Sequence, residues 1–339
     1  MRYPEFLKDN GTIGLIATSC GNNKNPYRLR TQEGIKYFEN LGYKIKKGHR
    51  LFRQHNAVSG PHTLRADDFN KMYKNKHVDL IWSTGGGEIM MGMLPYVDFN
   101  KIKKLPPKYF AGFSDNTNLT FTLTTLCDVA TLYLPGIGHF ASNPLPINAY
   151  EYLSMLQGKK LSYDSYEFYF GEKSRENKVD DPIATHIYLD EVIYKTIDGN
   201  NTSISGRLIG GCIDVLVCLV GTPFDKVSQF VEKYKDDGII WYFDVCDLNS
   251  CGLYRALFQL EQAGWFKYIK GFVFGRQGNY EILDYSFVDV MKDCLAKYDV
   301  PIIYDVDITH VSPTLPIING AYANISCTDG KGHFEFILK

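Results

Sequence analysis

Three short apolar runs in the first third of the chain restrict the fold most, because each leads into a polar or glycine-rich loop. They are TIGLIA at 12–17, VDLIWS at 78–83 and YFA at 109–111. Helical patterns lie between them, over 31–40 and 64–73. Alternating strands and helices predict a parallel α/β sheet. Functional loops of such sheets gather at the carboxyl ends of the strands, here 18–25, 84–88 and 112–116.

The second half of the chain follows a polar, aromatic-rich segment. Residues 157–205 lack helical periodicity, which predicts a linker and an elaborated surface segment. Beyond them the pattern predicts strands at 239–243, 271–274 and 301–306, helices at about 251–263 and 284–298, and a terminal hairpin from 321–326 and 333–338. We therefore expect an N-terminal α/β domain over 1–160, a linker and elaborated segment over 161–205, and a C-terminal domain over 206–339.

Charge and composition favour a small-molecule partner. The 37 basic and 38 acidic residues give a net charge of -1, so electrostatics offer no reason to expect nucleic acid or an anionic membrane. The apolar stretch near the N-terminus is too short for a signal peptide, and a cytoplasmic location is expected. Eight scattered cysteines without a CxxC pair favour reduced, buried thiols over disulfides or a zinc site. We expect neither a cofactor nor a metal.

A serine stands where the third apolar run turns into a helix, in KYFAGFSDNTNLTF at 108–121. Serine often caps helix N-termini, and this is one interpretation of Ser114. The other is a nucleophile held at the edge of the sheet with the positive end of the helix behind it. GFSDN differs from the GxSxG pattern because Asn116 replaces the second glycine. The residues alone leave both interpretations open.

The glycine run at 85–87 follows the second apolar run. It can place a backbone N–H beside the serine, as an oxyanion donor requires. A tight turn is a simpler interpretation. A phosphate cradle is a third, but the run lacks both GxGxxG and GxxxxGK[ST] spacing.

A base and an acid would be needed to activate the serine. Among eight histidines, His310 follows a buried run at the start of a proline-rich loop, although a structural role remains open. Asp244 ends the apolar run IIWYFD, where a carboxylate needs a partner such as a histidine N–H. Asp247 is the neighbouring rival, and Asp305 or Asp307 could act as caps or supports.

Six stretches carry a resemblance to a known family, and they occur in the family's order along nearly the whole chain. They are IGLIATS, LRADDFNKMYKNKHVDLIWSTGGG, AGFSDNT, GRLIGGCIDVLVCLVGTP, IIWYFDV with LYRALFQLEQAGW, and PIIYDVDITHVSPTLPIINGA. The sequence resembles the LD-carboxypeptidase family of serine peptidases, which includes muramoyltetrapeptide carboxypeptidases and microcin C immunity peptidases.

The resemblance implies a fold and a set of catalytic residues. The fold is an amidotransferase-like parallel-sheet α/β domain followed by a C-terminal domain with a small β-barrel, with the site at their interface. The family's nucleophile falls on Ser114, its histidine on His310 and its acid on Asp244. The same resemblance assigns the oxyanion hole to the backbone N–H groups of Gly86 and Asp115.

Two positions depart from the family pattern. The acid is normally a glutamate, and the shorter Asp244 requires either an inward shift of the backbone or a longer hydrogen bond to His310. Thr309 stands where the family often has glycine, which restricts the loop before His310.

The resemblance also implies a function. We expect a serine carboxypeptidase with a Ser-His-acid triad that cleaves an amide next to a carboxylate-bearing residue. The substrate would be the L,D-bond of cell-wall tetrapeptides, with release of D-alanine, or an aminoacyl-nucleotide antibiotic. Gly87, Glu88 and Arg276 are expected at the substrate, and Arg276 would meet its terminal carboxylate. Arg276 could instead be a surface or linker-bridging arginine. We expect a small peptide or peptidyl-nucleotide as partner, and a homodimer.

The sequence leaves open the role of the aromatic residues at 161–205 and two other functional classes. The aromatic side chains of the 161–205 segment could stack on a nucleobase, cover the barrel or form a dimer surface; they are Tyr163, Tyr166, Phe168, Tyr169 and Phe170. The chain could be a non-catalytic ligand-binding relative in which Asp244 marks a decayed site. A nucleotide kinase using the glycine run is a third class, but the sequence offers it no phosphate-binding lysine and no clear pair of metal-binding carboxylates.

Overall fold

The computed structural model describes residues 1–277 and 281–339, which divide into two compact units. The N-terminal unit comprises Met1–Lys160, Lys178–Ile187 and Pro316–Asn319. The C-terminal unit comprises Leu161–Asn177, Tyr188–Leu315 and Gly320–Lys339. The domain boundaries expected from the sequence stay a prediction.

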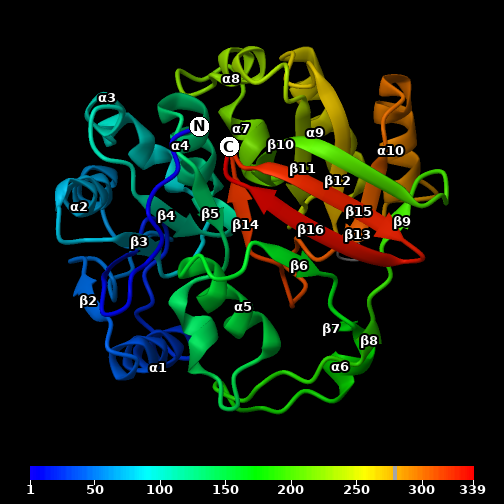
Figure 1. Cartoon of the computed structure of the whole chain (residues 1–339). Coiled ribbons are helices and arrows are strands. Elements are labelled where there is room, and N and C mark those ends of the chain that lie inside the picture. The colour runs from blue at the N-terminus through cyan, green and yellow to red at the C-terminus, as the bar shows by residue number, and fades with distance from the viewer. Residues whose placement is uncertain (278–280) are drawn as a thin grey trace. The chain divides into compact units, whose positions relative to one another are not determined.

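The N-terminal unit is built on a six-stranded sheet in the order β14-β5-β4-β3-β1-β2. Its strands are β1 (Thr12–Ile16), β2 (Lys44–Lys47), β3 (Leu80–Ser83), β4 (Tyr109–Gly112), β5 (Thr131–Tyr133) and β14 (Ile317–Asn319). The first five are parallel, while β14, from near the end of the chain, pairs antiparallel with β5 (Figure 1). The expected parallel α/β sheet is confirmed.

Three of the helices of this unit, those that overlap 31–40 and 64–73 and the one after the serine turn, were expected from the sequence and have shifted ends, whereas those at Phe99–Ile102 and Ile147–Leu156 were not predicted. The helices are α1 (Tyr27–Asn40), α2 (His62–Lys74), α3 (Phe99–Ile102), α4 (Thr117–Cys127) and α5 (Ile147–Leu156), with 3₁₀ turns at Met90–Tyr96, Ser114–Asn116 and Ile137–Ala141. Strands β3 and β4 are buried along their whole length. Because β1, β3 and β4 are neighbours and parallel, the loops that follow them meet at one edge of the sheet.

The C-terminal unit contains an eight-stranded mixed sheet in the order β6-β16-β15-β10-β11-β12-β13-β9. Its strands are β6 (Ser162–Asp164), β9 (Lys195–Thr196), β10 (Thr202–Cys212), β11 (Ile239–Asp244), β12 (Ile269–Gly275), β13 (Ile302–Val306), β15 (Tyr322–Thr328) and β16 (Lys331–Ile337). Strands β10 to β13 are parallel, and the predicted terminal hairpin is the antiparallel pair β15 and β16.

The remaining elements of this unit are short, apart from two amphipathic helices. The helices are α6 (Glu172–Glu176), α7 (Ile213–Leu219), α8 (Val227–Lys233), α9 (Ser250–Gln262) and α10 (Phe287–Leu295), with a 3₁₀ turn at Ala296–Tyr298; β7 (Phe168–Tyr169) and β8 (Asp190–Glu191) form a separate ribbon. In the described ranges, the sheet order begins at β6 and ends at β9 without a ladder between them. The closed barrel therefore stays a prediction.

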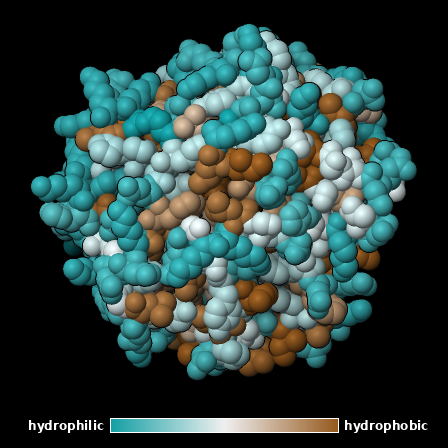
Figure 2. Space-filling model, in the orientation of Figure 1, coloured by the Kyte–Doolittle hydropathy of each residue, from teal (hydrophilic) through white to brown (hydrophobic). Residues whose placement is uncertain are grey.

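The face of the molecule drawn in Figure 2 is mostly hydrophilic. A hydrophobic patch lies near its centre, and further hydrophobic residues lie toward its lower edge. Among the residues that the structure describes, there is no helix of the length and apolarity that crossing a bilayer requires.

Candidate active site

Ser114 lies in a strained turn at the carboxyl end of β4. Its φ is 62°, in the left-handed region that costs an L-residue about 1–2 kcal/mol. Its backbone N–H donates to the Tyr133 hydroxyl at 3.2 Å. Capping does not explain the serine, since the N-cap positions here are Phe113 and Asn116, and neither makes a side-chain cap. A strained polar residue at such an edge is typical of functional sites.

The glycine run after β3 packs directly against this serine. A Cβ added to Gly86 would lie 2.9 Å from Ser114 Cβ, 3.2 Å from its Oγ and 3.6 Å from the backbone nitrogen of Asp115. Gly87 has a φ of 149°, and a Cβ there would overlap Ser19 Oγ. Only glycine at position 86 therefore lets this backbone approach Ser114 so closely, and only glycine at position 87 fits beside Ser19. The neighbouring Glu88 is exposed.

The side chain of Asp115 is buried, and both of its carboxylate oxygens accept hydrogen bonds. Its carboxylate accepts from the Ser19 hydroxyl, from the Met90 backbone N–H at 2.9 Å and from Asn118 Nδ2 at 2.9 Å. Burial raises the pKa of Asp115, while these donors act in the opposite direction. These hydrogen bonds fix Asp115, whose backbone nitrogen lies beside Gly86.

In the C-terminal unit, His310 and Asp244 form a hydrogen-bonded pair. Asp244 ends β11 with no exposed surface, and its carboxylate oxygens lie 2.9 Å from His310 Nδ1. The shorter acid thus reaches the histidine at an ordinary distance. Asp247, the rival acid, is exposed. Burial by itself lowers the pKa of His310, but the Asp244 carboxylate more than offsets this and holds that pKa well above its usual range.

Polar contacts on both sides hold this pair in place. The Cys246 thiol lies within hydrogen-bonding reach of His310. The Asp214 carboxylate accepts the backbone N–H groups of Cys246, Asp247 and Leu248 at 3.1, 2.9 and 3.0 Å. It therefore fixes the loop that follows Asp244. Sequence reasoning missed Asp214; its one signal was an acid at the start of an apolar helix.

The loop that carries His310 is closed by hydrogen bonds within itself. Thr309 donates its N–H to the Thr314 hydroxyl at 3.2 Å, and Thr314 donates to the Asp307 carbonyl at 3.1 Å. The Thr309 hydroxyl donates to the Arg276 carbonyl at 2.5 Å and accepts from Val311 N–H at 2.9 Å. The departure at 309 therefore adds two hydrogen bonds that a glycine could not make.

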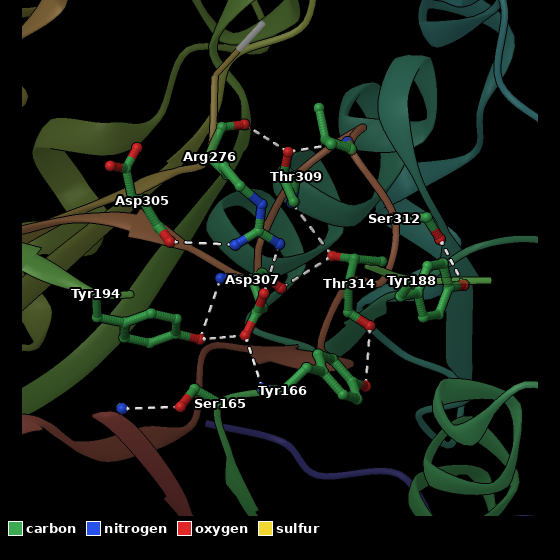
Figure 3. A network of polar contacts seen from close by, with 12 residues as sticks. Ser165, Tyr166, Tyr188, Tyr194, Arg276, Asp305, Asp307, Thr309, Ser312 and Thr314 are labelled. Atoms are coloured by element: carbon green, nitrogen blue, oxygen red, sulfur yellow. Dashed lines mark hydrogen bonds and ion pairs between the residues drawn. The ribbon is translucent and has the colours of Figure 1, made fainter. Parts of the chain in front are cut away.

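Arg276 lies at the centre of a buried polar network (Figure 3). Its Nη2 contacts the Asp307 carboxylate at 2.5 Å, and only 6% of the residue is exposed. The same carboxylate accepts from Tyr194 hydroxyl at 2.9 Å and Tyr166 N–H at 3.0 Å. The guanidinium also lies over the ring of Tyr169. These contacts favour the bridging role for Arg276, and its contact with substrate stays a prediction.

The aromatic segment contributes to the interior of the C-terminal unit. Tyr163 pairs with Phe334 of β16 and Tyr166 donates to the Thr314 carbonyl, and both are buried. Tyr163 belongs to β6 of the mixed sheet, and burial leaves neither tyrosine available for stacking on a nucleobase. Phe168 is the most exposed ring of the five, at 46%.

The candidate site residues fall into two groups, one within each unit. In the described ranges, no group of three or more His, Cys, Asp or Glu side chains is arranged to hold a metal ion. The N-terminal unit brings Ser114, Gly86 and Asp115 together. The C-terminal unit brings His310 and Asp244 together. Gly87 adjoins the first group, Glu88 is exposed beside it, and Arg276 contacts the loop of the second.

Two named relatives match this chain over nearly its whole length. The chain is 23% identical over 336 residues to the probable murein peptide carboxypeptidase of Bacillus subtilis, covering 98% of this chain and 94% of that protein. It is 24% identical over 339 residues to the microcin C7 self-immunity protein MccF of Escherichia coli, covering 94% and 93%.

A solved structure of MccF with glutamyl sulfamoyl guanosine shares the fold, with a TM-score of 0.80 at 19% identity over 99% of this chain and 98% of that one. Two family models match in succession. The LD-carboxypeptidase N-terminal domain matches residues 13–134 and the LD-carboxypeptidase C-terminal domain matches residues 205–325. The chain belongs to the LD-carboxypeptidase family.

Proposed function

We propose that this protein is a serine carboxypeptidase that hydrolyses an amide bond next to a carboxylate-bearing residue. The observation that carries the proposal is the left-handed Ser114, with the backbone of Gly86 in contact with it and the Asp115 nitrogen alongside. A hydroxyl beside two backbone donors is what formation of an acyl-enzyme requires.

The proposed reaction uses the residues of both units. His310 Nδ1–H donates to Asp244, which leaves the basic lone pair on Nε2. Nε2 takes the proton of the Ser114 hydroxyl as its oxygen attacks the amide carbonyl, and the N–H groups of Gly86 and Asp115 stabilise the oxyanion. The imidazolium then protonates the leaving amine. Water, deprotonated by His310, hydrolyses the ester and regenerates Ser114.

The first candidate substrate is the L,D-bond of a cell-wall tetrapeptide. The relative from Bacillus subtilis bears the name murein peptide carboxypeptidase, and it matches nearly the whole chain. The second is an aminoacyl-nucleotide, which the match to MccF favours, since a MccF structure holds glutamyl sulfamoyl guanosine. Because two of the five candidate stacking rings are buried, the described contacts give this second substrate no further support.

The test compares hydrolysis of a tetrapeptide ending in D-alanine with hydrolysis of an aspartyl-sulfamoyl-adenosine analogue. Turnover of one of them, abolished in Ser114→Ala, is expected. A fluorophosphonate should label Ser114 in the wild type, and His310→Ala should slow that labelling. A folded wild type that neither hydrolyses these compounds nor reacts with the probe would favour a non-catalytic ligand-binding protein. Retained turnover in Ser114→Ala would refute the nucleophile assignment.

A further inference from the structure

Asn116 stands two residues after the serine, in the position where it departs from GxSxG, and its side chain connects three loops. Its Nδ2 donates to the Gly85 carbonyl and to the Phe113 carbonyl, each at 2.9 Å. Its Oδ1 accepts from the Thr18 hydroxyl at 2.6 Å. The residue is 1% exposed. Since carbonyl oxygens only accept, the atom facing Gly85 and Phe113 has to be the amide nitrogen.

The Asn116 side chain does not cap the helix that it precedes. Asn116 is the N-cap residue of α4, where asparagine usually accepts an N–H of its own helix. Here it makes no such cap and turns back toward β1 and the loop after β3. Gly112 leaves room for it, because a Cβ at 112 would lie 2.6 Å from Asn116 Cβ. Helix formation alone does not account for this side chain.

The hydrogen bonds fix the peptide planes on both sides of Gly86. The Gly85 carbonyl accepts from Asn116 and also from the Ser83 hydroxyl at 3.1 Å. The Gly86 carbonyl accepts from the Cys20 N–H at 3.1 Å. In a trans peptide the C=O of one residue and the N–H of the next point in opposite directions. Holding the Gly85 carbonyl toward Asn116 therefore directs the Gly86 N–H away from it.

We propose that Asn116 is a positioning residue for the oxyanion hole, which keeps the Gly85–Gly86 peptide in the orientation that presents the Gly86 N–H to the developing oxyanion. The inference rests on the proposed acyl-transfer function. Asn116 touches neither the substrate nor the reacting atoms in this account. It acts through the peptide plane of Gly86, and Ser83 assists it from the same carbonyl.

The decisive variant is Asn116→Asp, which keeps the size of the side chain but turns a carboxylate oxygen toward two carbonyl oxygens. Repulsion should rotate the Gly85–Gly86 peptide and withdraw one oxyanion donor. Loss of one such donor lowers kcat by about 100- to 1,000-fold. We expect that loss with KM changed by less than about threefold, because the donor acts in the transition state and not in ground-state binding. The rate of fluorophosphonate reaction with Ser114 should fall in parallel.

The matched control is Asn148→Asp. Asn148 is also fully buried in the N-terminal unit, and its Nδ2 donates to the Tyr152 hydroxyl at 3.0 Å. It should affect the melting temperature without affecting kcat. Two milder variants, Asn116→Ala and Ser83→Ala, each remove donors to the Gly85 carbonyl without adding charge and should lower kcat by about tenfold at unchanged KM. They carry the test if Asn116→Asp does not fold.

The outcomes separate this inference from the function on which it rests. If the wild type shows neither turnover nor labelling, the proposed function fails and the inference fails with it. If the wild type is active and folded Asn116 variants keep their kcat, or lose only thermal stability, the inference alone is overturned. An equal loss of kcat in Asn148→Asp would also overturn it, because buried asparagines in general would then be responsible.

Discussion

Replacing Gly86 by alanine should damage catalysis far more than folding. The added methyl would lie 2.9 Å from Ser114 Cβ, whereas non-bonded carbons prefer about 3.5–4.0 Å. The serine and the loop must therefore separate by roughly 0.6 Å or more. A misplacement of about 1 Å can cost roughly 100-fold in rate. We expect kcat/KM to fall by about 100-fold, or about 2.7 kcal/mol of transition-state stabilisation.

The same methyl one residue earlier is the comparison. A Cβ on Gly85 would meet only Asn22 Oδ1 at 3.6 Å, an ordinary contact. Gly85→Ala should therefore lose far less activity than Gly86→Ala. The assay is steady-state hydrolysis of whichever substrate the wild type cleaves, together with the rate of fluorophosphonate labelling and the thermal unfolding midpoint. Equal activities in Gly86→Ala and wild type, or equal losses in the two alanine variants, would refute the close approach as the basis of the site.

Two further perturbations test the C-terminal unit. Because the Asp244 carboxylate holds the pKa of His310 well above its usual range, the neutral base is lost as pH falls through that raised value; the acid limb of the kcat/KM profile should lie above about 6.5 and move to lower pH in Asp244→Asn. An unmoved limb would contradict the pairing. Arg276→Ala should leave the buried Asp307 carboxylate without its cation and lower the free energy of unfolding in urea by about 3–5 kcal/mol. A raised KM with unchanged stability would instead favour Arg276 as a substrate ligand.

The sequence was most informative where local pattern and chemistry agree. Strands β1, β3 and β4 were expected from apolar runs. The glycines after β3 were expected to bring a backbone N–H close to the serine turn. Pattern alone left capping and catalysis open for Ser114, because both place a serine before a helix. The positive φ of Ser114 and the N-cap positions at Phe113 and Asn116, neither of which makes a side-chain cap, argue against capping.

Tertiary contacts account for what the sequence did not reveal. A positive charge in a turn after a strand suggested that Arg276 meets a substrate carboxylate. It could not show that Asp307, 31 residues further on, would contact its Nη2. The aromatic residues of the 161–205 segment likewise carry no periodicity, so their burial against β16 and the loop at 307–315 depends on contacts more than 140 residues apart. Non-local pairing of this kind leaves no local signal.

The proposed catalytic groups belong to different units, so their contributions can be separated by experiment. The serine turn and the glycine loop contact each other within the N-terminal unit, so their variants should lower kcat at every pH. The histidine and its acid contact each other within the C-terminal unit, so Asp244→Asn should change the pH dependence as well as the rate. A double variant of Gly86→Ala and Asp244→Asn then shows whether the two groups act together or independently. If both groups act in one transition state, their losses combine less than additively once the step they share is abolished. Fully additive losses would mean that the glycine loop and the His310–Asp244 pair stabilise the transition state independently of each other.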